Sequence, residues 1–329
     1  MDPKTTEIAY AYCQQVCKIA STNFYGSFST LELEKRRAVH AVYTLCKWVD
    51  DIVDGDQNPS VKETEDLLMQ TKERDEILRE IHFGSEPSNS KPVYMQRLMA
   101  LVAIRNDLKR ASLGQITPDD NQVFIALQDV FINYPIRLQD FETVIEGMED
   151  DLFPVKCKTW DDLRAYSYKV ASAVGLILIE IYGYDDQAAR LHAIDLGIQM
   201  QLINILRDVS EDLERGRVYL PIDVLQSHGI DVVDLTKPSL ARNPSWSAFV
   251  NEYLGIVKQH QISAMLLFDY LDSRSRVQPK IMLNTYQMIF NHIIRKSGDV
   301  LTKPLKVPKS FKLRLWAKIN FMKLKNRLV

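Results

Sequence analysis

Two acidic clusters carry the residue types and spacings best suited to chemistry in this sequence. In the first cluster, residues 50–54, Asp50 and Asp54 lie four positions apart. On a helix this spacing places both carboxylates on one face, one turn apart, where like charges destabilise the helix unless a cation lies between them. A hard divalent cation such as Mg²⁺ takes carboxylate oxygens together with substrate phosphate and water. Lys47 borders the same face and can hold a phosphate beside such a metal.

The second cluster is an oxygen-rich stripe within residues 201–212. Asn204, Asp208 and Asp212 occupy positions i, i+4 and i+8, and Gln201 extends the stripe. These positions share one face of a helix. A carboxamide placed within a helix, as Asn204 is, suggests coordination more than solvent exposure or core packing.

Basic residues follow the second stripe and favour a phosphate ligand. Arg215 and Arg217 come soon after Asp212, and arginine suits bidentate contact with phosphate oxygens. One pair of aspartates four apart is a weak signal, because acidic helix surfaces are common and usually only solvated. Two such clusters with basic neighbours favour a diphosphate bound through Mg²⁺. The charge of a diphosphate must be neutralised before its C–O bond ionises.

Helices must position these residues, because the sequence reads as one helix after another. In residues 31–54, apolar residues recur at three- and four-residue steps and line one face. Only 12 glycines in 329 residues leave few tight turns, and no alternating strand pattern occurs. The sequence therefore predicts an all-α fold in a single domain over residues 1–329. Helices are expected at 4–23, 31–54, on to about 82, 92–112, 119–132, 135–149, 159–184, 186–214, 221–227, 246–271 and 276–297.

The composition is that of a globular chain. Hydrophobic residues make up 46%, and 41 Lys+Arg against 43 Asp+Glu give a net charge of −2, which excludes a disordered or fibrous chain. We expect no nucleic-acid partner and a monomer or weak dimer. Four cysteines without a C-x-x-C pair fit a reduced, cytoplasmic setting. Residues 1–10 lack a signal-peptide pattern, and the most apolar run, 170–184, is predicted to be too short to cross a bilayer.

The tail, residues 303–329, differs from the rest of the chain. It carries nine basic residues and no acidic residue, so the preceding 302 residues hold a net charge of −11. Leu315, Trp316, Ile319 and Phe321 lie among the basic residues. Such a segment suits peripheral contact with an anionic membrane surface. The alternative is a solvated final helix packed on the body of the protein.

Both acidic clusters belong to a longer set of segments, at residues 21–25, 36–39, 43, 46, 50–54, 147–148, 166–175, 204–212 and 215–221. Together these segments resemble the head-to-head prenyl synthases, the family of phytoene, dehydrosqualene and squalene synthases. The resemblance runs from about residue 10 to residue 300 and is greatest to phytoene synthases of the bacterial type. The two acidic clusters and the run R-G-R-V-Y-L-P at residues 215–221 are its most specific motifs.

This resemblance implies an isoprenoid synthase-type helical bundle around a central cavity, with the acidic helices facing each other at its mouth. It also implies a two-stage reaction. One allylic diphosphate ionises, the C2–C3 double bond of a second substrate attacks the cation, and proton loss closes a cyclopropylcarbinyl diphosphate. That intermediate ionises, rearranges and loses a proton, or takes a hydride in squalene synthases. Aromatic faces and polar oxygens in a water-excluded cavity stabilise such cations.

The resemblance further implies roles for individual residues. The expected ligands of Mg²⁺, or of Mn²⁺ in its place, are Asp50, Asp54, Asn204, Asp208 and Asp212. The expected catalytic residues are these four aspartates with Tyr43 and Tyr166. The expected substrate contacts are Ser21, Phe24, Phe28, Lys47, Gln201, Asn204, Arg207, Arg215, Arg217, Tyr219 and Tyr286.

Plain packing is an alternative interpretation for several of these residues. Phe24, Phe28 and Tyr286 at helical spacing also suit a hydrophobic core. The small residues at 171–175, beside Tyr166, can either admit a substrate or bring two helices close together.

Four departures from the family pattern affect this interpretation. Lys47 and Glu146 stand where the family usually has Arg and Asp, which keeps each charge but changes its geometry. Residues 172–173 replace a common Gly-Thr pair, and Gly26 replaces a frequent aromatic residue. The last two border the expected cavity, so they leave substrate length and product open. None removes a metal ligand.

The function that fits best is the joining of two geranylgeranyl diphosphates to phytoene, in carotenoid biosynthesis. The main alternative is the same chemistry on two farnesyl diphosphates, giving dehydrosqualene, squalene or presqualene diphosphate. NADPH is expected not to be required, because the sequence has neither a C-terminal membrane anchor nor a Rossmann fingerprint. A non-catalytic assembly factor is a further alternative, although such relatives tend to lose these aspartates. A head-to-tail prenyltransferase fits poorly with Asn204 and residues 215–221.

Overall fold

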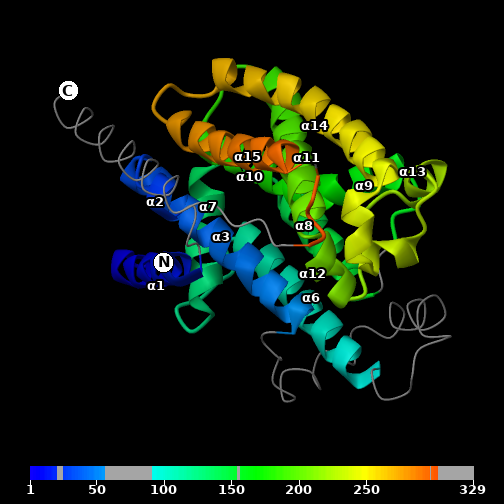
Figure 1. The fold of residues 1–329 in the computed structure, drawn as a ribbon. Helices are drawn as coiled ribbons and strands as arrows, with labels where there is room; N and C mark the ends of the chain where they lie inside the picture. The colour runs from blue at the N-terminus through cyan, green and yellow to red at the C-terminus, as the bar shows by residue number, and fades with distance from the viewer. Residues whose placement is uncertain (21–24, 56–90, 154–155, 297, 303–329) are drawn as a thin grey trace. The chain divides into compact units, whose positions relative to one another are not determined.

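The fold is that of a computed structural model of the chain (Figure 1). The structure describes residues 1–20, 25–55, 91–153, 156–296 and 298–302. The candidate residues Ser21 and Phe24 lie outside these ranges. So do the helix expected to end near residue 82 and the basic tail 303–329.

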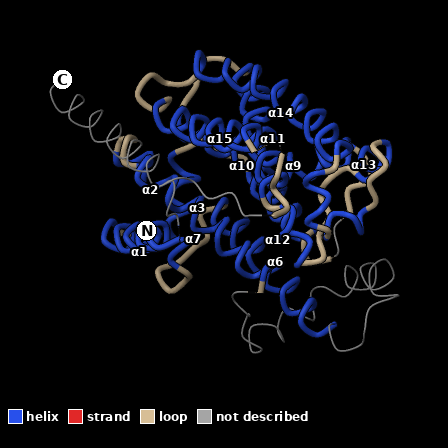
Figure 2. The backbone as a smooth tube through the Cα atoms, viewed as in Figure 1, coloured by secondary structure: helices blue, strands red, loops and turns tan. Residues whose placement is uncertain are grey.

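Helices account for nearly all regular structure in these ranges, so the all-α prediction is confirmed (Figure 2). No strand occurs in the described residues, and the isolated bridges Lys156–Val218 and Tyr184–Leu271 are the extended pairings found there. The elements are α1 (Pro3–Ala20), α2 (Tyr25–Phe28), α3 (Leu33–Asp54), α6 (Lys91–Ser112), α7 (Gln122–Asn133), α8 (Leu138–Asp150), α9 (Trp160–Ser167), η1 (Tyr168–Ser172), α10 (Ala173–Tyr182), α11 (Ala188–Arg207), α12 (Val209–Glu214), α13 (Ile222–Ser227), η2 (Val232–Thr236), η3 (Pro238–Arg242), α14 (Pro244–Tyr270) and α15 (Val277–Arg295).

The observed elements differ from the predicted helices at a few places. The short helix α2 and the 3₁₀ helices η2 and η3 are additional, as expected for short connecting pieces with little periodic signal. One predicted helix is interrupted by a π-helical turn, η1, and another by a break at Asp208. Both interruptions fall beside candidate site residues, where π-turns are common in proteins.

The chain divides into two compact units by its contacts. The first unit comprises residues 1–16 and 40–153, and the second comprises residues 17–39 and 154–329. The helices α1 and α3 each contribute to both. The expectation of a single domain over residues 1–329 stays a prediction.

In the first unit, α6 packs against α7 and α8. The ring of Trp48 on α3 lies 5.8 Å from that of Phe124 on α7, between ring centroids. Thr44 donates a 3.2 Å hydrogen bond to the Cys13 carbonyl and thereby ties α3 to α1. These contacts fix the segment of α3 that carries the first acidic cluster.

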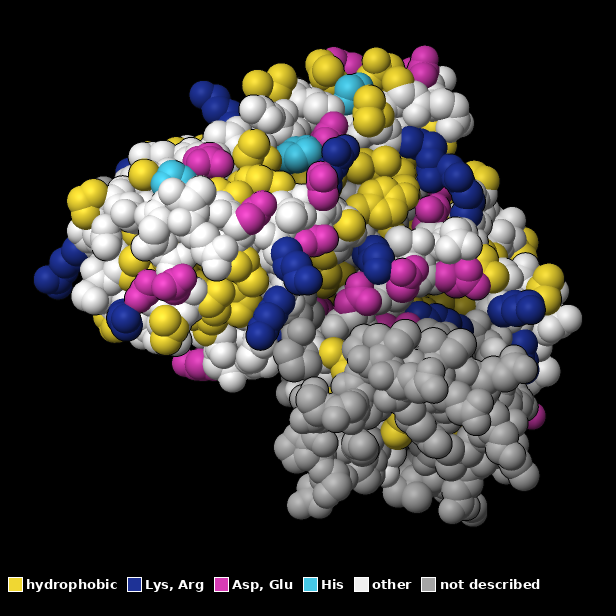
Figure 3. Space-filling model, turned by 90° about the vertical axis from the view of Figure 1, so that its right-hand side faces the viewer, with side chains coloured by type: hydrophobic (Ala, Val, Ile, Leu, Met, Phe, Trp, Pro, Cys, Tyr) yellow, Lys and Arg dark blue, Asp and Glu magenta, His cyan; other side chains and the backbone are white. Residues whose placement is uncertain are grey.

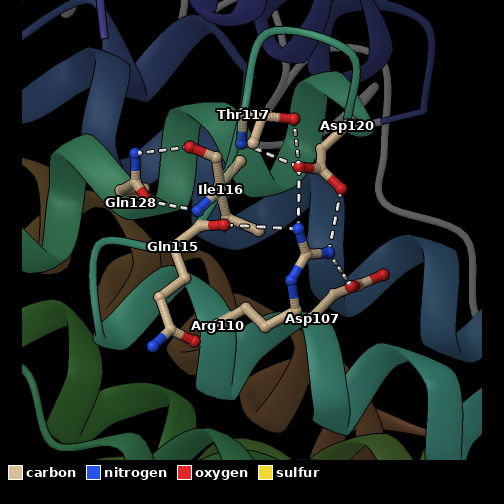
Figure 4. Close-up of polar contacts among 7 residues, drawn as sticks. All are labelled: Asp107, Arg110, Gln115, Ile116, Thr117, Asp120 and Gln128. Atoms are coloured by element: carbon tan, nitrogen blue, oxygen red, sulfur yellow. Dashed lines mark hydrogen bonds and ion pairs between the residues drawn. The ribbon is translucent and has the colours of Figure 1, made fainter.

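The loop between α6 and α7 is held by a charged network near the protein surface (Figure 4). Arg110 donates two hydrogen bonds of 2.9 Å to the two carboxylate oxygens of Asp120 and a third, of 2.8 Å, to Asp107. The amide and hydroxyl of Thr117 also donate to Asp120, at 2.7 and 2.8 Å. Buried Gln128 accepts from the Ile116 amide at 2.7 Å. The loop is therefore positioned by ionic and amide hydrogen bonds.

In the second unit, α11 is the central helix and packs against α10, η1, α14 and α15 (Figure 1). Most residues of α11 are buried, and its apolar residues accordingly lie on nearly every side of the helix. A Cβ atom on Gly197 would lie 2.5 Å from the Ser172 Cα, and one on Gly175 would lie 3.2 Å from the Ala193 carbonyl oxygen. The small residues therefore bring α11 into close backbone contact with η1 and α10.

One helical stretch, Trp160–Tyr182, is long and apolar enough to cross a membrane by length and composition, and half of it is buried inside the protein. The sequence-based expectation concerned the apolar run 170–184 alone. The helical stretch is longer because α9, η1 and α10 follow one another without a gap and together span 23 residues. A buried core helix passes the same test, and part of this stretch lines the cavity described below.

The exposed surface mixes charges of both signs. On the face shown in Figure 3, acidic and basic side chains are interspersed, with hydrophobic side chains between them. Among the described residues, large exposed hydrophobic side chains include Ile262, Met265 and Leu266 on α14. Mixed charge of this kind is typical of globular protein surfaces.

Candidate active site

The first acidic cluster lies at the carboxyl end of α3, in the first unit. The Lys47 ammonium is 3.0 Å from an Asp50 carboxylate oxygen and also pairs with Asp51. Surrounding protein reduces the hydration of Asp50 and raises the pKa of its carboxyl; Lys47 opposes this shift, while Asp54 and Asp51 reinforce it. Desolvation alone would lower the pKa of Lys47, but its pairs with Asp51 and Asp50 raise it. One lysine on the helix thus pairs with two of the three carboxylates.

Arg97 on α6 belongs to this cluster, although the sequence did not reveal it. Its Nη1 donates a 3.0 Å hydrogen bond to the Val53 carbonyl, at the helix end where a cation is stabilising. A Cβ on Gly55, which has φ +86°, would lie 2.2 Å from the guanidinium, so glycine gives Arg97 room to approach. Arg97 lies 44 residues from Val53 in the sequence, so no local spacing could have indicated it.

The second acidic stripe spans the junction of α11 and α12. Asp208 ends α11 with φ −104° and ψ 13°, outside regular helical values. The backbone hydrogen bonds nevertheless continue through it, from the Asp208 amide to the Asn204 carbonyl and from the Asp212 amide to the Asp208 carbonyl, both 2.9 Å. The helical register of Asn204, Asp208 and Asp212 is therefore preserved, as their spacing predicts.

Arg207 binds Asp208 directly. Its Nε donates a 2.7 Å hydrogen bond to one carboxylate oxygen, and an Nη donates to the other. Desolvation would lower the pKa of Arg207, but the bond to Asp208 raises it. Arg207 was predicted to contact substrate, and the structure shows it as the partner of the expected metal ligand. The same arrangement occurs at the first cluster, where Lys47 pairs with Asp50.

The segment after α12 folds back on the stripe. Gly216 has φ +75°, and the Arg217 amide donates a 2.8 Å hydrogen bond to the Asp212 carbonyl. A left-handed residue at a helix end favours glycine. The guanidinium of Arg215 lies 3.4 Å from Glu211. The geometry therefore places the backbone of Arg217 at the end of the stripe, as the basic run after Asp212 suggests.

Tyr219 and Tyr166 stack on each other. Their ring centroids are 4.7 Å apart with an interplanar angle of 23°, and both residues are buried. The Cys157 amide donates a 3.1 Å hydrogen bond to the Val218 carbonyl, which brings the segment before α9 beside the segment that carries Tyr219. A crevice of about 10 Å³ beside Tyr219, Arg217 and Asp212 has room for about one water molecule and no substrate.

The second unit contains a larger, mostly apolar cavity of about 240 Å³. Its walls come from η1, α10, α11, α14 and α15. The lining residues at one end include Gln201, Asn204 and Tyr286, which the sequence predicted, and the small residues Ala171 and Gly175 line a wall. The close-packing interpretation of the small-residue stretch is therefore confirmed, and the stretch also borders the cavity.

Asn204 is the polar group that joins the cavity to the acidic stripe. It hydrogen-bonds Tyr286, whose hydroxyl pKa is raised by burial and lowered by this bond. The carboxamide oxygen of Asn204 is buried without a hydrogen-bond partner in the described structure. An unpartnered buried oxygen is costly unless a ligand satisfies it. The observation fits a cation at this position.

The oxygen atoms of the two acidic clusters suit a hard divalent metal whose remaining coordination positions are filled by substrate. Among the described residues, no group of three His, Cys, Asp or Glu side chains converges on one point. Mg²⁺ needs no such group, because it binds through one or two carboxylates together with phosphate oxygens and water. The carboxylates of Asp208 and Asp212 with the oxygen of Asn204 are the ligands expected at one such site, and those of Asp50 and Asp54 are the ligands expected at another.

The remaining predicted residues lie in different places. Tyr43 is half-buried on α3, one turn before Lys47, in the first unit. Phe28 is buried on α2 and does not line the cavity, as the packing alternative predicts. Tyr166 is buried outside the cavity lining as well. The expectation that the two acidic helices face each other stays a prediction.

Comparison with known proteins gives the family. Residues 18–311 match the squalene/phytoene synthase family. A chloroplastic phytoene synthase from an Oncidium hybrid is 30% identical over 311 residues, covering 93% of this chain and 66% of the relative. The 15-cis-phytoene synthase of Synechococcus elongatus is 30% identical over 314 residues, covering 91% and 88%. The chain thus spans about two thirds of the length of the Oncidium relative.

Solved structures have the same fold. A dehydrosqualene synthase superposes with a TM-score of 0.76 at 24% identity, covering 99% of this chain and all of the other. Squalene synthase HpnC from Alicyclobacillus acidocaldarius superposes with a TM-score of 0.71 at 20% identity, covering 90% and 97%. The isoprenoid synthase-type fold is therefore confirmed.

The family match and the relatives at 30% identity show that the protein is a prenyltransferase. The chain belongs to the squalene/phytoene synthase family, whose members join two prenyl diphosphates head to head. Both the recognition of the family and the enzyme class predicted from the sequence are confirmed. Members of the family use a divalent metal to bind the prenyl diphosphates.

Proposed function

We propose that this protein joins two molecules of geranylgeranyl diphosphate to phytoene, with Mg²⁺ as the metal and without NADPH. The observation that carries the proposal is the apolar cavity that begins at Asn204, one helical turn from Asp208. An apolar chain and a diphosphate can then bind side by side along one helix. The choice of a C20 substrate is supported by the relatives, which are phytoene synthases at 30% identity.

The residues that would hold Mg²⁺ are Asp50, Asp54, Asn204, Asp208 and Asp212. Bound there with substrate, the metal would neutralise diphosphate charge so that an allylic C–O bond can ionise. Lys47 and Arg207, which pair with Asp50 and Asp208, hold these carboxylates in place. Positive charge on both residues also favours an arriving diphosphate.

The reaction balances without a redox partner. Ionisation of one substrate releases diphosphate, and the C2–C3 double bond of the second forms the new carbon–carbon bond. Loss of one proton closes the cyclopropylcarbinyl diphosphate, and a second ionisation, rearrangement and proton loss give phytoene. The apolar cavity walls exclude water, which would otherwise trap the cations. The buried ring of Tyr286 at the cavity end offers a π-face to a nearby cation.

The test is an incubation of purified protein with Mg²⁺ and either geranylgeranyl or farnesyl diphosphate, with and without NADPH. Hydrocarbon products are identified by chromatography and mass spectrometry. We expect phytoene from the C20 substrate in both conditions. Dehydrosqualene or presqualene diphosphate from the C15 substrate alone would replace this proposal with its main alternative. Squalene formed only with NADPH would do the same, and no product from either substrate would favour a non-catalytic assembly factor.

We also propose that the protein is cytoplasmic and contacts anionic membranes through residues 303–329. Nine basic residues accompany Leu315, Trp316, Ile319 and Phe321 in this tail, and basic segments with large apolar residues bind anionic lipid surfaces. Truncation after Thr302 is expected to reduce co-sedimentation with phosphatidylglycerol vesicles and not with phosphatidylcholine vesicles. Equal sedimentation of both forms would contradict this proposal. A monomer or weak dimer remains our expectation for the oligomeric state.

A further inference from the structure

The last turn of α3 carries Asp54, and the end of a helix depends on partners from outside the helix. The final carbonyl groups of a helix have no donor within it, and helix ends fray unless other groups bind them. Asp54 is the last residue of α3, whereas Asp50 lies one turn inside the helix. The position of the Asp54 carboxylate therefore depends on what holds this end of α3, and that of Asp50 depends on it less.

Arg97 on α6 holds the chain on both sides of Asp54. Its Nη1 donates a 3.0 Å hydrogen bond to the carbonyl of Val53, the residue before Asp54. Its Nη2 lies against Gly55, the residue after Asp54, where an added Cβ would be 2.2 Å away. The Val53 side chain is buried in the core. One guanidinium from a different helix thus brackets the backbone of an expected metal ligand.

The guanidinium of Arg97 is not part of a charged network within the described residues. Its hydrogen bonding there is to the Val53 carbonyl, and its Nε is buried without a partner. Arg105, about two turns later on α6, differs because its guanidinium pairs with the carboxylate of Glu149 on α8. In this part of the molecule Arg97 therefore binds the backbone of α3, whereas Arg105 neutralises an acidic side chain.

The charge of Arg97 and its contact with the backbone have opposite effects on a bound cation. A guanidinium near a metal site repels the metal ion, so removal of the charge alone would tighten metal binding. A group that orients a metal ligand strengthens binding, and its loss typically costs about 10–100-fold in metal affinity. Because the two effects differ in sign, a measured metal affinity separates them.

We infer that Arg97 is a positioning residue that fixes Asp54 for metal binding. It acts through the backbone on either side of Asp54 and not as a ligand. The inference rests on the proposed function, since it concerns a residue that would hold Mg²⁺ there. Arg97 contacts the backbone of residues 53 and 55, so its loss is expected to affect Asp54 more than Asp50.

The test measures Mn²⁺ binding by electron paramagnetic resonance in the presence of inorganic diphosphate, without turnover. We expect Arg97→Met, which keeps most of the apolar stem, to raise the dissociation constant for Mn²⁺ about tenfold. Arg97→Lys keeps a donor for the Val53 carbonyl and is expected to recover part of the affinity. Asp54→Ala is expected to weaken binding by itself, and Arg97→Met should add no further loss in that background.

The matched control is Arg105→Met, which removes an arginine of the same helix that pairs with Glu149. It is expected to lower stability and to leave the dissociation constant for Mn²⁺ unchanged. In steady-state assays, Arg97→Met should raise the Mg²⁺ concentration that gives half the maximal rate, also about tenfold. A loss of folded protein would instead lower the rate equally at every Mg²⁺ concentration. If Arg97→Met does not fold, Arg97→Gln decides by the same dissociation constant.

Three results would overturn the inference. They are wild-type or tighter Mn²⁺ binding in Arg97→Met, a loss no greater than that in Arg105→Met, and an equal loss from Arg97→Met with and without Asp54. Absence of Mn²⁺ binding by the wild-type protein with diphosphate would overturn the metal assignment of the proposed function together with this inference. The wild-type measurement therefore distinguishes failure of the proposed function from failure of the role of Arg97 alone.

Discussion

Two aspartates of the first unit, Asp120 and Asp50, have opposite surroundings. Asp120 accepts two hydrogen bonds from Arg110 and two from Thr117, and these hold the pKa of its carboxyl at about 2 (Figure 4). Reduced hydration raises the pKa of Asp50, and neighbouring Asp54 and Asp51 reinforce the shift. Both residues lie beside a basic side chain, so the presence of a partner does not distinguish them.

The difference lies in the balance of charge and hydrogen bonds. The carboxylate of Asp120 accepts four hydrogen bonds, and one guanidinium and one turn of the chain supply them. The Asp50 cluster brings three carboxylates together on one helix end, two of them paired with Lys47, which leaves it better suited to a divalent cation. The contrast predicts a structural role for Asp120 and agrees with the metal-binding role that the sequence predicts for Asp50.

The largest expected effect follows from this contrast. Asp50→Ala is expected to reduce turnover of geranylgeranyl diphosphate about a thousandfold or more, since it removes an expected metal ligand that stabilises the leaving diphosphate. Its helix content, measured by circular dichroism, is expected to match that of the wild type. The matched variant Asp120→Ala should keep its turnover per folded molecule. Wild-type turnover in Asp50→Ala would contradict the assignment of the first cluster.

The same pair of variants is expected to differ in stability in the opposite direction. Asp120→Ala removes the bidentate partner of Arg110 and the acceptor of the Thr117 amide. We expect the free energy of unfolding to fall by about 2 kcal/mol, as is usual when a charged hydrogen-bond network is broken. Urea denaturation measures this change. A loss in Asp120→Ala no greater than that in Asp119→Ala, an exposed neighbour, would show that the network is dispensable.

Ligand addition sharpens the comparison further. Mg²⁺ with inorganic diphosphate is expected to raise the melting temperature of the wild-type protein. At roughly tenfold excess of ligand over its dissociation constant, the free energy of unfolding rises by about 1–2 kcal/mol. The reason is that the crowded carboxylates and the unpartnered oxygen of Asn204 gain a cation. Asp208→Ala should lose most of this shift, whereas Asp120→Ala should keep it. An equal shift in both variants would place the metal elsewhere.

The contrast also explains what the sequence could reveal. Helix positions and the two acidic stripes follow from local spacing, because residues four apart share a helix face whatever the tertiary structure. The register of Asn204, Asp208 and Asp212 was therefore predictable even though the helix breaks at Asp208. The break itself was not, since it depends on how the following segment folds back.

Contacts between distant elements could not be predicted in this way. Arg97 reaches the end of α3 from another helix, and Tyr182 on α10 donates a hydrogen bond to Gln278 on α15. Neither residue belongs to a motif with local spacing. The sequence also assigned Phe28 to the substrate cavity by resemblance, whereas the cavity of the second unit is lined without it. Side-chain contacts between helices depend on how the helices pack, and no repeating spacing in one sequence predicts that packing.

The smallest expected effect is a pH dependence that isolates Asp120. In the folded protein its pKa is about 2, below the value of 3.8 for the free carboxyl, because Arg110 and Thr117 favour the charged form. The stabilisation is therefore complete above about pH 4 and is lost as the pH falls through about 2. We expect Asp120→Asn to lower the free energy of unfolding by about 1 kcal/mol more at pH 6 than at pH 2, after allowance for solvent screening. Urea denaturation at both pH values measures this difference, with Asp119→Asn as the control, and equal losses at both pH values would show that Asp120 is not stabilised by its charge.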